Sequence, residues 1–316
     1  MNVGLLLKKA KEKIPALDAE VILCEVLGGK DKSYLVAHDD EEVSALVEEK
    51  FFELVSRREK GEPVAYILGK KEFFAREFLV DKNVLIPRPE SEMIVEIAKK
   101  LDVSRILDVG TGSGVLAISL ALEIPKAEVF GVDIAEEALA LARKNAERLG
   151  AEISFSRSNL LESVDGQFDL IVANLPYVDR DWDFLSKELE FEPEIALFAE
   201  DRGLYLIKKL IEQVRGRTKY LILEADPLQH EEIEKYCEKF GMKVLEKAGF
   251  VLLVKVEGGA AEEKNEDYDN GDAEDDWGID FFWADFPVVF CEGGIDFIEH
   301  EEDDCEDCGE LGDNES

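Results

Sequence analysis

Long apolar runs are absent from the sequence: no stretch approaches the roughly 20 residues that a membrane-spanning helix needs. The first 20 residues lack a cleavage-like site, and their charges follow a short apolar run, so we expect no signal peptide. Cysteine is scarce as well, with five in 316 residues, an odd number that suits a reducing compartment. These absences predict a cytoplasmic protein with no membrane partner.

Basic residues are few relative to acidic ones. Lys and Arg number 37 against 73 Asp and Glu, which gives a formal charge of −36. The imbalance is greatest in residues 257–316, which hold 24 acidic residues and one lysine. Because phosphate backbones are bound by clustered Lys and Arg, we expect no direct nucleic-acid binding. A local basic patch within the less acidic residues 1–256 would be the exception.

Residues 1–70 are expected to form a small helical domain. Apolar residues recur there at three- and four-residue spacing in three stretches, which is typical of amphipathic helices. These stretches are residues 3–14, 18–29 and 41–61. Asp18 is a candidate N-cap, and Gly28 and Gly61 are candidate stops. Such a bundle packs or recognises a partner more often than it carries out chemistry, so we interpret it as a substrate-recognition domain.

Residues 71–90 are expected to form a β-hairpin that links two domains. Two short alternating runs flank Asp81-Lys82-Asn83, where we place the turn. Pro87 and Pro89 then end the extended segment. A helix restarts behind Ser91, which is a candidate N-cap.

Residues 91–256 alternate between apolar strands and helices. Strands are expected at residues 105–110, 127–133, 152–158, 168–174, 219–225, 242–247 and 250–256, and helices near 113–122, 135–149, 203–214 and 228–240. This alternation predicts an α/β fold with a doubly wound, mostly parallel sheet of seven strands. Only Ala248 and Gly249 separate the last two strands, so we expect the last strand to be antiparallel.

Residues 257–316 form an acidic tail that we expect to be disordered, because it is highly charged and poor in large apolar residues. An aromatic stretch at 277–290 is expected to dock on the protein body or on a partner. Four tail residues have metal-binding side chains, but their spacing matches no standard zinc module, so we predict no metal site. They are Cys291, His300, Cys305 and Cys308.

A glycine-rich turn joins an apolar strand to a helix at residues 106–114. Glycines let the backbone approach a ligand closely, and the next strand ends in Asp133, placed to accept hydrogen bonds from ribose hydroxyls. A dinucleotide and S-adenosylmethionine both fit these features. The G-x-G-x-G spacing, the preceding Asp108 and the antiparallel edge strand favour S-adenosylmethionine, whose charged amino-acid group Asp108 would hold.

The strand at 168–174 runs into Asn174-Leu175-Pro176-Tyr177. Asn and Pro end strands, so a plain strand end followed by a turn is one interpretation. The other is a site that grips a planar nitrogen beside a reactive cofactor. The glycine turn in the same domain favours the second interpretation.

Residues 1–256 resemble the peptide-chain release factor glutamine N5-methyltransferases (PrmC/HemK), a family of class I, Rossmann-like methyltransferases. Residues 62–92 match the family's interdomain hairpin and its PRPETE motif, with Ser91 in place of the threonine. Residues 191–207 match its EP…AL…DGL segment, and residues 174–177 stand where the family usually has N-P-P-Y.

The resemblance implies that the chain transfers a methyl group from S-adenosylmethionine to the side-chain amide of the GGQ glutamine in a release factor, its protein partner. Its implied cofactor-binding residues are Asp108, Gly110, Thr111, Gly112, Ser113, Gly114, Asp133, Asn159, Leu160 and Asn174. Its implied catalytic residues are Asn174, Leu175, Pro176 and Tyr177, and Arg88 and Glu90 join these four in binding the substrate.

Three positions depart from the family pattern. Leu175 replaces the first proline of N-P-P-Y. Asn159 stands where an acidic residue often lies near the adenine, and Leu160 stands where the family often has an aromatic one. The changes at 159 and 160 would reshape adenine packing and leave the sugar and methionine contacts in place.

An amide nitrogen is a poor nucleophile because its lone pair is delocalised into the carbonyl group. Asn174 can accept one amide hydrogen through its side-chain oxygen, and the main-chain carbonyl of Leu175 can accept the other. Pro176 stiffens this segment, and Tyr177 can wall the planar amide. Two acceptors would orient the nitrogen toward the methyl group, and aiming of this kind supplies up to about 7–11 kcal/mol.

Charged residues around this segment have a structural interpretation beside the functional one. Arg88 is expected to pair with Glu90, Glu92 or Glu192, a role that competes with direct substrate contact. Glu224, at the end of a strand, is expected to fix a loop.

Two other functions fit parts of the sequence. Asn-Leu-Pro-Tyr also resembles the motif of rRNA adenine dimethyltransferases, so an amino-methyltransferase acting on adenine in RNA or DNA is one alternative. A non-catalytic S-adenosylmethionine-binding protein whose acidic tail recruits partners is the other. The acidic charge and the PRPE segment count against the first, and the intact Asn174–Tyr177 motif counts against the second.

Overall fold

The computed structural model describes residues 1–182 and 186–256. The predictions for the tail, including those for its cysteines and histidine, lie outside the described residues. No helix in the described part of the chain is long and apolar enough to cross a bilayer.

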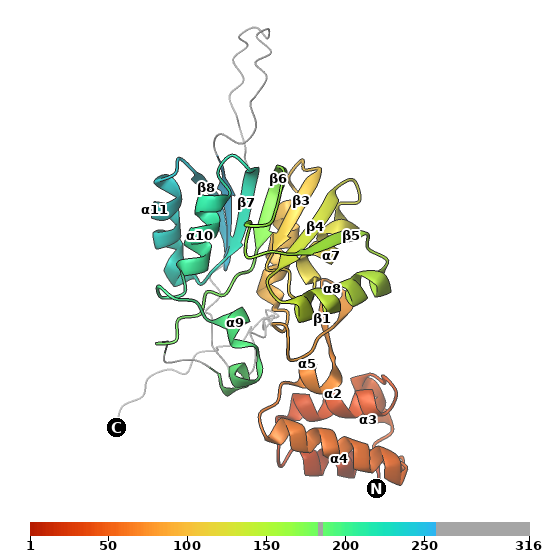
Figure 1. Cartoon of the computed structure of the whole chain (residues 1–316). Helices are drawn as coiled ribbons and strands as arrows, with labels where there is room; N and C mark the ends of the chain where they lie inside the picture. Colours follow the sequence, from red (N-terminus) through yellow and green to blue (C-terminus); the bar gives the residue numbers. More distant parts are fainter. Residues whose placement is uncertain (183–185, 257–316) are drawn as a thin grey trace, which may run out of the picture. The chain divides into compact units, whose positions relative to one another are not determined.

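The N-terminal part is helical (Figure 1). Its helices are α1 (Val3–Ala10), α2 (Ala16–Val26), α3 (Lys32–Ala37), α4 (Ala45–Glu59) and α5 (Val64–Leu68). The side chains of Asn2, Asp31 and Ser44 cap α1, α3 and α4 by accepting hydrogen bonds from backbone N–H groups of the first turns. Apolar residues of the helices share one buried cluster, which includes Leu6, Leu23 and Phe51.

Helix boundaries in this part differ from the expected ones in two ways. Asp18 does not cap α2: Pro15 occupies the cap, and Asp18 lies in the first turn, where it accepts a hydrogen bond of 2.6 Å from Arg58. Helices α3 and α5 were not predicted, because six and five residues are too few to display a helical period. The glycines after α2 and α4 follow the helix ends with positive φ, as expected for stops.

A two-stranded hairpin follows, formed by β1 (Lys70–Phe73) and β2 (Arg76–Leu79). Its turn consists of Phe74 and Ala75, whose φ angles are 48° and 56°. The expected turn at Asp81-Lys82-Asn83 is therefore wrong. Those residues make a separate turn after β2, in which the Asp81 side chain accepts a hydrogen bond from the N–H of Asn83. Left-handed Phe and Ala residues carry no sequence signal for such a turn, which usually contains Asn and Gly.

The large sheet has seven strands in the order β5-β4-β3-β6-β7-β9-β8. They are β3 (Arg105–Val109), β4 (Glu128–Asp133), β5 (Ile153–Arg157), β6 (Phe168–Ala173), β7 (Thr218–Glu224), β8 (Lys243–Ala248) and β9 (Val251–Lys255). Strands β3 to β7 are parallel, and β9 runs antiparallel between β7 and β8. The predicted α/β fold class, with its helical N-terminal part, hairpin and antiparallel last strand, is confirmed.

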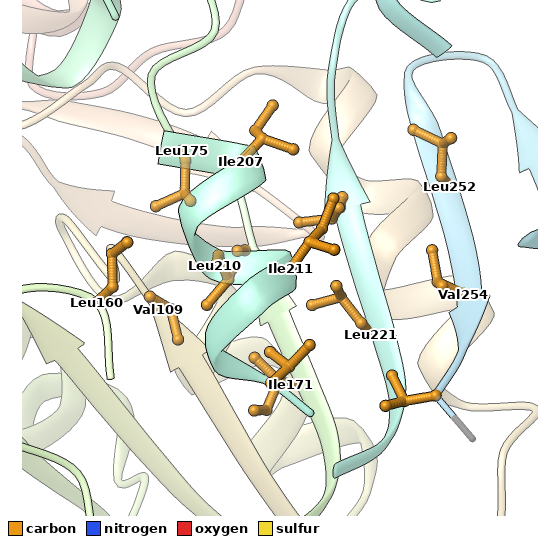
Figure 2. Packing of buried hydrophobic residues seen from close by; sticks show 14 of the residues in the cluster. Val109, Leu160, Ile171, Leu175, Ile207, Leu210, Ile211, Leu221, Leu252 and Val254 are labelled. Carbon is orange, nitrogen blue, oxygen red and sulfur yellow. The ribbon is translucent and has the colours of Figure 1, made fainter. Parts of the chain in front are cut away.

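Helices cover both faces of this sheet (Figure 1). They are α6 (Glu92–Ala98), α7 (Val115–Glu123), α8 (Glu136–Leu149), α10 (Tyr205–Gln213) and α11 (His230–Glu238). The described residues also form the short helix α9 (Glu194–Leu197) and the 3-10 turns η1 (Pro89–Ser91), η2 (Lys187–Phe191) and η3 (Pro227–Gln229). Alternate residues of β6 point to opposite faces: Ile171 joins the cluster under α10 and α11, and Val172 joins the cluster with α6 and α7. Figure 2 shows the first cluster, where Ile207, Leu210 and Ile211 of α10 pack onto the sheet.

The unusual hairpin turn generates a stability prediction. Ala75→Gly should stabilise the protein by about 1 kcal/mol, because a left-handed conformation costs a residue with a Cβ more than the added chain entropy of glycine costs. Ala140→Gly, at an exposed position of α8, is the matched control and should destabilise by about 1 kcal/mol. Urea unfolding measures both, and equal losses for the two variants would contradict the turn geometry.

Candidate active site

The carboxyl ends of three adjacent strands bring the predicted site residues to one edge of the sheet. Strand β6 lies between β3 and β7. Asp108 and the glycine turn belong to the end of β3, Asn174 follows β6, and Glu224 ends β7. In open α/β sheets this edge is where ligands bind.

The backbone of the glycine turn is held by the protein itself. The N–H groups of Gly110 and Thr111 donate to the carbonyl of Val132, at 2.8 and 2.9 Å. The N–H of Gly112 donates to Asp133 at 2.9 Å. Gly110, Gly112 and Gly114 have φ angles of 76°, 54° and 84°, which explains the need for glycine. These amides are therefore already bonded within the protein.

Asp108 is fully buried beneath this turn. Its Oδ2 accepts hydrogen bonds from the Thr111 hydroxyl at 2.6 Å and from the Ala117 N–H, in the first turn of α7, at 3.2 Å. Its Oδ1 is buried and has no hydrogen-bond partner among the described residues. Burial raises the pKa of Asp108 to about 7. The carboxyl group is therefore poorly compensated and would gain from a nearby positive charge.

These contacts discriminate between the two cofactor classes. A pyrophosphate needs free N–H groups at a helix N-terminus. Here the N–H groups of Gly110, Thr111 and Gly112 are bonded to β4, and Asp108 accepts from the Ala117 N–H in the first turn of α7. A cationic ligand fits this site better than a dinucleotide does, and the unpartnered Asp108 oxygen is the observation that supports it.

Asp133 lies half-buried at the end of β4. One of its oxygens accepts from Gly112 and the other from the Ala135 N–H, both at 2.9 Å. A carboxylate oxygen has two lone pairs, so each retains capacity for a ligand hydroxyl. Burial raises the pKa of Asp133.

The remaining predicted cofactor residues differ in how they are placed. Ser113 is buried, and its carbonyl accepts a hydrogen bond from Asn145 at 2.9 Å. The Asn159 amide donates to Glu162 at 2.9 Å. Leu160 has a φ of 51° and is buried in the apolar cluster of Figure 2, together with Val109 and Leu175.

Leu175 joins the glycine turn to the segment that follows β6. Its side chain is 4% exposed and belongs to the same apolar cluster. A Cβ added at Gly110 would lie 3.1 Å from the Leu175 Cδ2, so the turn packs closely against this leucine. The position that departs from the family motif is thus fixed by packing.

Asn174 is held by a chain of hydrogen bonds that crosses the site. Its Nδ2 donates to the Ser91 hydroxyl at 2.9 Å, and Ser91 donates to Glu224 Oε2 at 2.5 Å. The Tyr177 hydroxyl donates to Glu224 Oε1 at 3.1 Å. Burial, with a contribution from the charge of Glu90, raises the pKa of Glu224 to about 7. Because Nδ2 of Asn174 donates to Ser91, Oδ1 is the side-chain atom of Asn174 that can accept a hydrogen bond.

Two of these residues have partners that the sequence did not predict. Ser91 does not cap α6: its side chain makes no capping hydrogen bond because the hydroxyl is committed to Glu224. Glu224 was interpreted as a loop-fixing residue, and in the structure it binds the hydroxyl groups of Ser91 and Tyr177, which lie on two segments outside the sheet. The only sequence signals were the strand-end position of Glu224 and the place of Ser91 directly after Glu90.

Arg88 pairs with Glu192, one of its three predicted partners. The two side chains lie 2.5 Å apart, and the Glu192 side chain is 1% exposed. The other Glu192 oxygen accepts from the N–H of Ile86 at 2.9 Å. In this structure Arg88 therefore forms the expected ion pair with an acidic residue of the same protein. Burial raises the pKa of Glu224 and of Tyr177, and the charge of nearby Glu90 raises both further.

The backbone of Tyr177 is held from a second side. Gln229 donates its side-chain amide to the carbonyls of Tyr177 and Arg202, both at 2.9 Å. Gly203 has a φ of 84°, and a Cβ there would lie 1.9 Å from the Tyr177 carbonyl oxygen. Sequence reasoning missed Gln229 and Gly203 as parts of the site, because their contacts join segments far apart in the chain.

No cluster of three or more His, Cys, Asp or Glu side chains in residues 1–182 and 186–256 is arranged to hold a metal ion.

Comparison with known proteins places both parts of the chain. Residues 3–69 match the family model described as PrmC N-terminal domain, and residues 89–186 match the methyltransferase small domain. A release factor glutamine methyltransferase of Koribacter versatilis is 42% identical over 216 residues, covering 66% of this chain and 77% of that protein. The protein of the same name from Haemophilus influenzae is 40% identical over 225 residues, with the same two coverages.

A solved methyltransferase structure from Pyrococcus furiosus is similar to this chain with a TM-score of 0.47 and 20% sequence identity. The match covers 60% of this chain and 92% of that protein's chain. With relatives above 30% identity matched over more than two thirds of their length, this chain belongs to the release factor glutamine methyltransferase family.

Proposed function

We propose that this protein transfers a methyl group from S-adenosylmethionine to the side-chain amide nitrogen (N5) of the glutamine in the GGQ motif of a peptide chain release factor. The observation that supports this proposal is the placement of Asn174 beside the glycine turn, with its Nδ2 bound to Ser91. Its Oδ1 and the Leu175 carbonyl would then accept the two hydrogens of one NH2 group. The curated relatives bear the name of this activity.

The carboxyl edge of the sheet would hold the cofactor. Asp108 and Asp133 supply negative charge and hydrogen-bond acceptors, and the glycine turn lets the backbone pass close to the ligand. Leu160 would supply an apolar wall. Asn159 directly precedes it in the chain, and Ser113 lies in the glycine turn. When bound, S-adenosylmethionine supplies an electrophilic methyl group on a positively charged sulfur.

The protein's own contribution to the reaction is orientation of the amide. Asn174 Oδ1 accepts one N–H of the glutamine side chain, and the Leu175 carbonyl accepts the other. Both hydrogens are then held in the plane, and the nitrogen's remaining electron density points out of that plane. The alkylated nitrogen is acidic and loses a proton without a dedicated base. Tyr177 forms a wall, held by Glu224 and Gln229.

Leu175 preserves this arrangement although it lacks the proline ring. The acceptor is a main-chain carbonyl, which any residue provides. The rigidity that a ring would contribute comes from two sources: Pro176 restricts the residue before it to extended conformations, and the Leu175 side chain is packed against Gly110.

The other parts of the chain have proposed roles that follow from this activity. Residues 1–70 would recognise the release factor, residues 71–90 would link the two domains, and residues 91–256 would form the catalytic domain. Glu90 would face the substrate, and Arg88 would support the wall of the site through Glu192. Because release factors act in translation, we place the protein in the cytoplasm.

The activity is tested with labelled S-adenosylmethionine, a purified bacterial release factor and ribosomal RNA. We expect label on the GGQ glutamine of the release factor, located by mass spectrometry. Asn174→Ala should lower kcat by about 100- to 1,000-fold, as for loss of one transition-state hydrogen-bond partner, while cofactor binding measured by calorimetry stays intact.

Asn83→Ala, at a turn residue after β2, is the control and should leave the rate unchanged. Label on the RNA and none on the release factor would refute the proposed substrate. A parallel loss of cofactor affinity in Asn174→Ala would refute the proposed role of that side chain.

Asp108→Asn tests the buried carboxyl group. The pKa of Asp108 is raised to about 7, above the value of about 4 in an unfolded chain, so stability is lost as pH rises between these values. The variant has no charge to bury. The melting temperature of ligand-free Asp108→Asn should therefore exceed that of the wild type by more at pH 8 than at pH 5. Each kcal/mol of difference in the free energy of unfolding corresponds to about 2–4 °C in melting temperature.

The same variant should bind S-adenosylmethionine more weakly, because it lacks the negative charge that the cationic ligand would compensate. Asp102→Asn is the control, because the Asp102 side chain is 95% exposed. It should change neither the affinity for S-adenosylmethionine nor the pH dependence of the melting temperature. A melting-temperature difference for Asp108→Asn that is the same at both pH values would show that this carboxyl group is not a buried charge.

A further inference from the structure

The hydrogen-bond chain at Asn174 has a direction that chemistry determines. Ser91 and Glu224 are 3% and 1% exposed, so bulk water does not compete for their hydrogen bonds. The chain runs from Asn174 Nδ2 to the Ser91 oxygen at 2.9 Å, and from the Ser91 hydroxyl to Glu224 Oε2 at 2.5 Å. These three residues lie on different segments: the end of β6, η1 and the end of β7.

Glu224 is ionised above its pKa of about 7, and an ionised carboxylate can only accept hydrogen bonds. The single hydroxyl proton of Ser91 is therefore committed to Glu224, and the Ser91 oxygen can only accept from its other neighbour. Of the two ends of the Asn174 amide, only the NH2 end donates. The other Glu224 oxygen accepts a hydrogen bond from the Tyr177 hydroxyl. Because Tyr177 is the donor in that contact, it does not change the role of the Ser91 hydroxyl as donor to Glu224 Oε2.

We infer that Ser91 and Glu224 are positioning residues that determine which end of the Asn174 amide faces the substrate, an inference that rests on the proposed function. They hold the NH2 end inward and thereby present Oδ1 to the glutamine. A reversed Asn174 would place its NH2 group against the NH2 group of the substrate, where neither accepts a hydrogen bond. The threonine that the family motif has at position 91 would keep the hydroxyl.

Glu224→Gln changes this direction with little change in shape. A glutamine at 224 offers a donor as well as an acceptor. Its NH2 group can donate to the Ser91 oxygen, which frees the Ser91 proton to donate to Asn174 Oδ1. Either orientation of the Asn174 amide then satisfies the hydrogen bonds that link Asn174, Ser91 and residue 224. The variant also removes a buried carboxylate, so its stability should not fall.

The test compares wild type, Ser91→Ala, Ser91→Thr and Glu224→Gln with a purified release factor as the methyl acceptor. We expect kcat to fall by roughly 100-fold in Ser91→Ala and Glu224→Gln, the size expected for a misplaced reacting group. Affinity for S-adenosylmethionine should stay constant, and the melting temperature of Glu224→Gln should be at or above that of wild type. Ser91→Thr should restore the rate that Ser91→Ala loses.

Ser119→Ala is the matched control. Ser119 is also a fully buried serine, in α7, but its hydroxyl has no hydrogen-bond partner among the described residues. Its removal should leave kcat unchanged. This control separates the loss of a specific hydrogen bond from the general effect of removing a buried hydroxyl.

The outcomes separate this inference from the proposed function. A wild-type enzyme that does not methylate the release factor would refute the function itself. An active wild type with unchanged kcat in Glu224→Gln and Ser91→Ala would refute the inference alone. Loss of cofactor affinity in step with kcat would also refute it, since the two residues would then act on the cofactor site. If Ser91→Ala fails to fold, Glu224→Gln decides.

Discussion

Asp108 and Glu224 are carboxyl groups buried on the two strands that flank β6, and neither forms an ion pair with a lysine or arginine in the described part of the chain. A buried carboxylate is costly unless donors surround it. Each one therefore gathers hydroxyl and N–H groups from other segments: the glycine turn and α7 surround Asp108, while Ser91 and Tyr177 bind Glu224. These two buried acids therefore determine which side chains can lie at this edge of the sheet.

Most of the fold was predictable from the sequence because its central strands are buried on both faces. Such strands appear as apolar runs, and the helices between them are long enough to show a 3.6-residue period. The errors occurred where local signals are weak. The turn at Phe74 and Ala75 has neither asparagine nor glycine, and the short helices α3 and α5 cover less than two turns.

The site was predictable only as far as contiguous motifs reach. The glycine turn and Asn174 each follow a strand, so their meeting at one edge follows from parallel topology. The partners of Asn174 and Tyr177 do not. Ser91 lies 83 residues from Asn174 and 133 from Glu224, and Gln229 lies 52 residues from Tyr177. Hydrogen bonds over such separations leave no pattern in one sequence, because each residue alone has an ordinary local explanation such as a helix cap or a strand end.

Two departures from the family pattern belong to one part of the structure. Leu160 and Leu175 are far apart in sequence, yet both are buried in the cluster that α10 covers (Figure 2). Each replaces a cyclic side chain, aromatic at one position and proline at the other, with a branched aliphatic one. Flexible leucines fill an irregular space as well as rings do when the surroundings are close-packed, and the close contact of Leu175 with Gly110 shows such packing. The acceptors in the proposed reaction are the Leu175 carbonyl and the Asn174 amide oxygen, and these substitutions remove neither. Packing beneath the site can therefore vary while the hydrogen-bonding atoms above it stay in position.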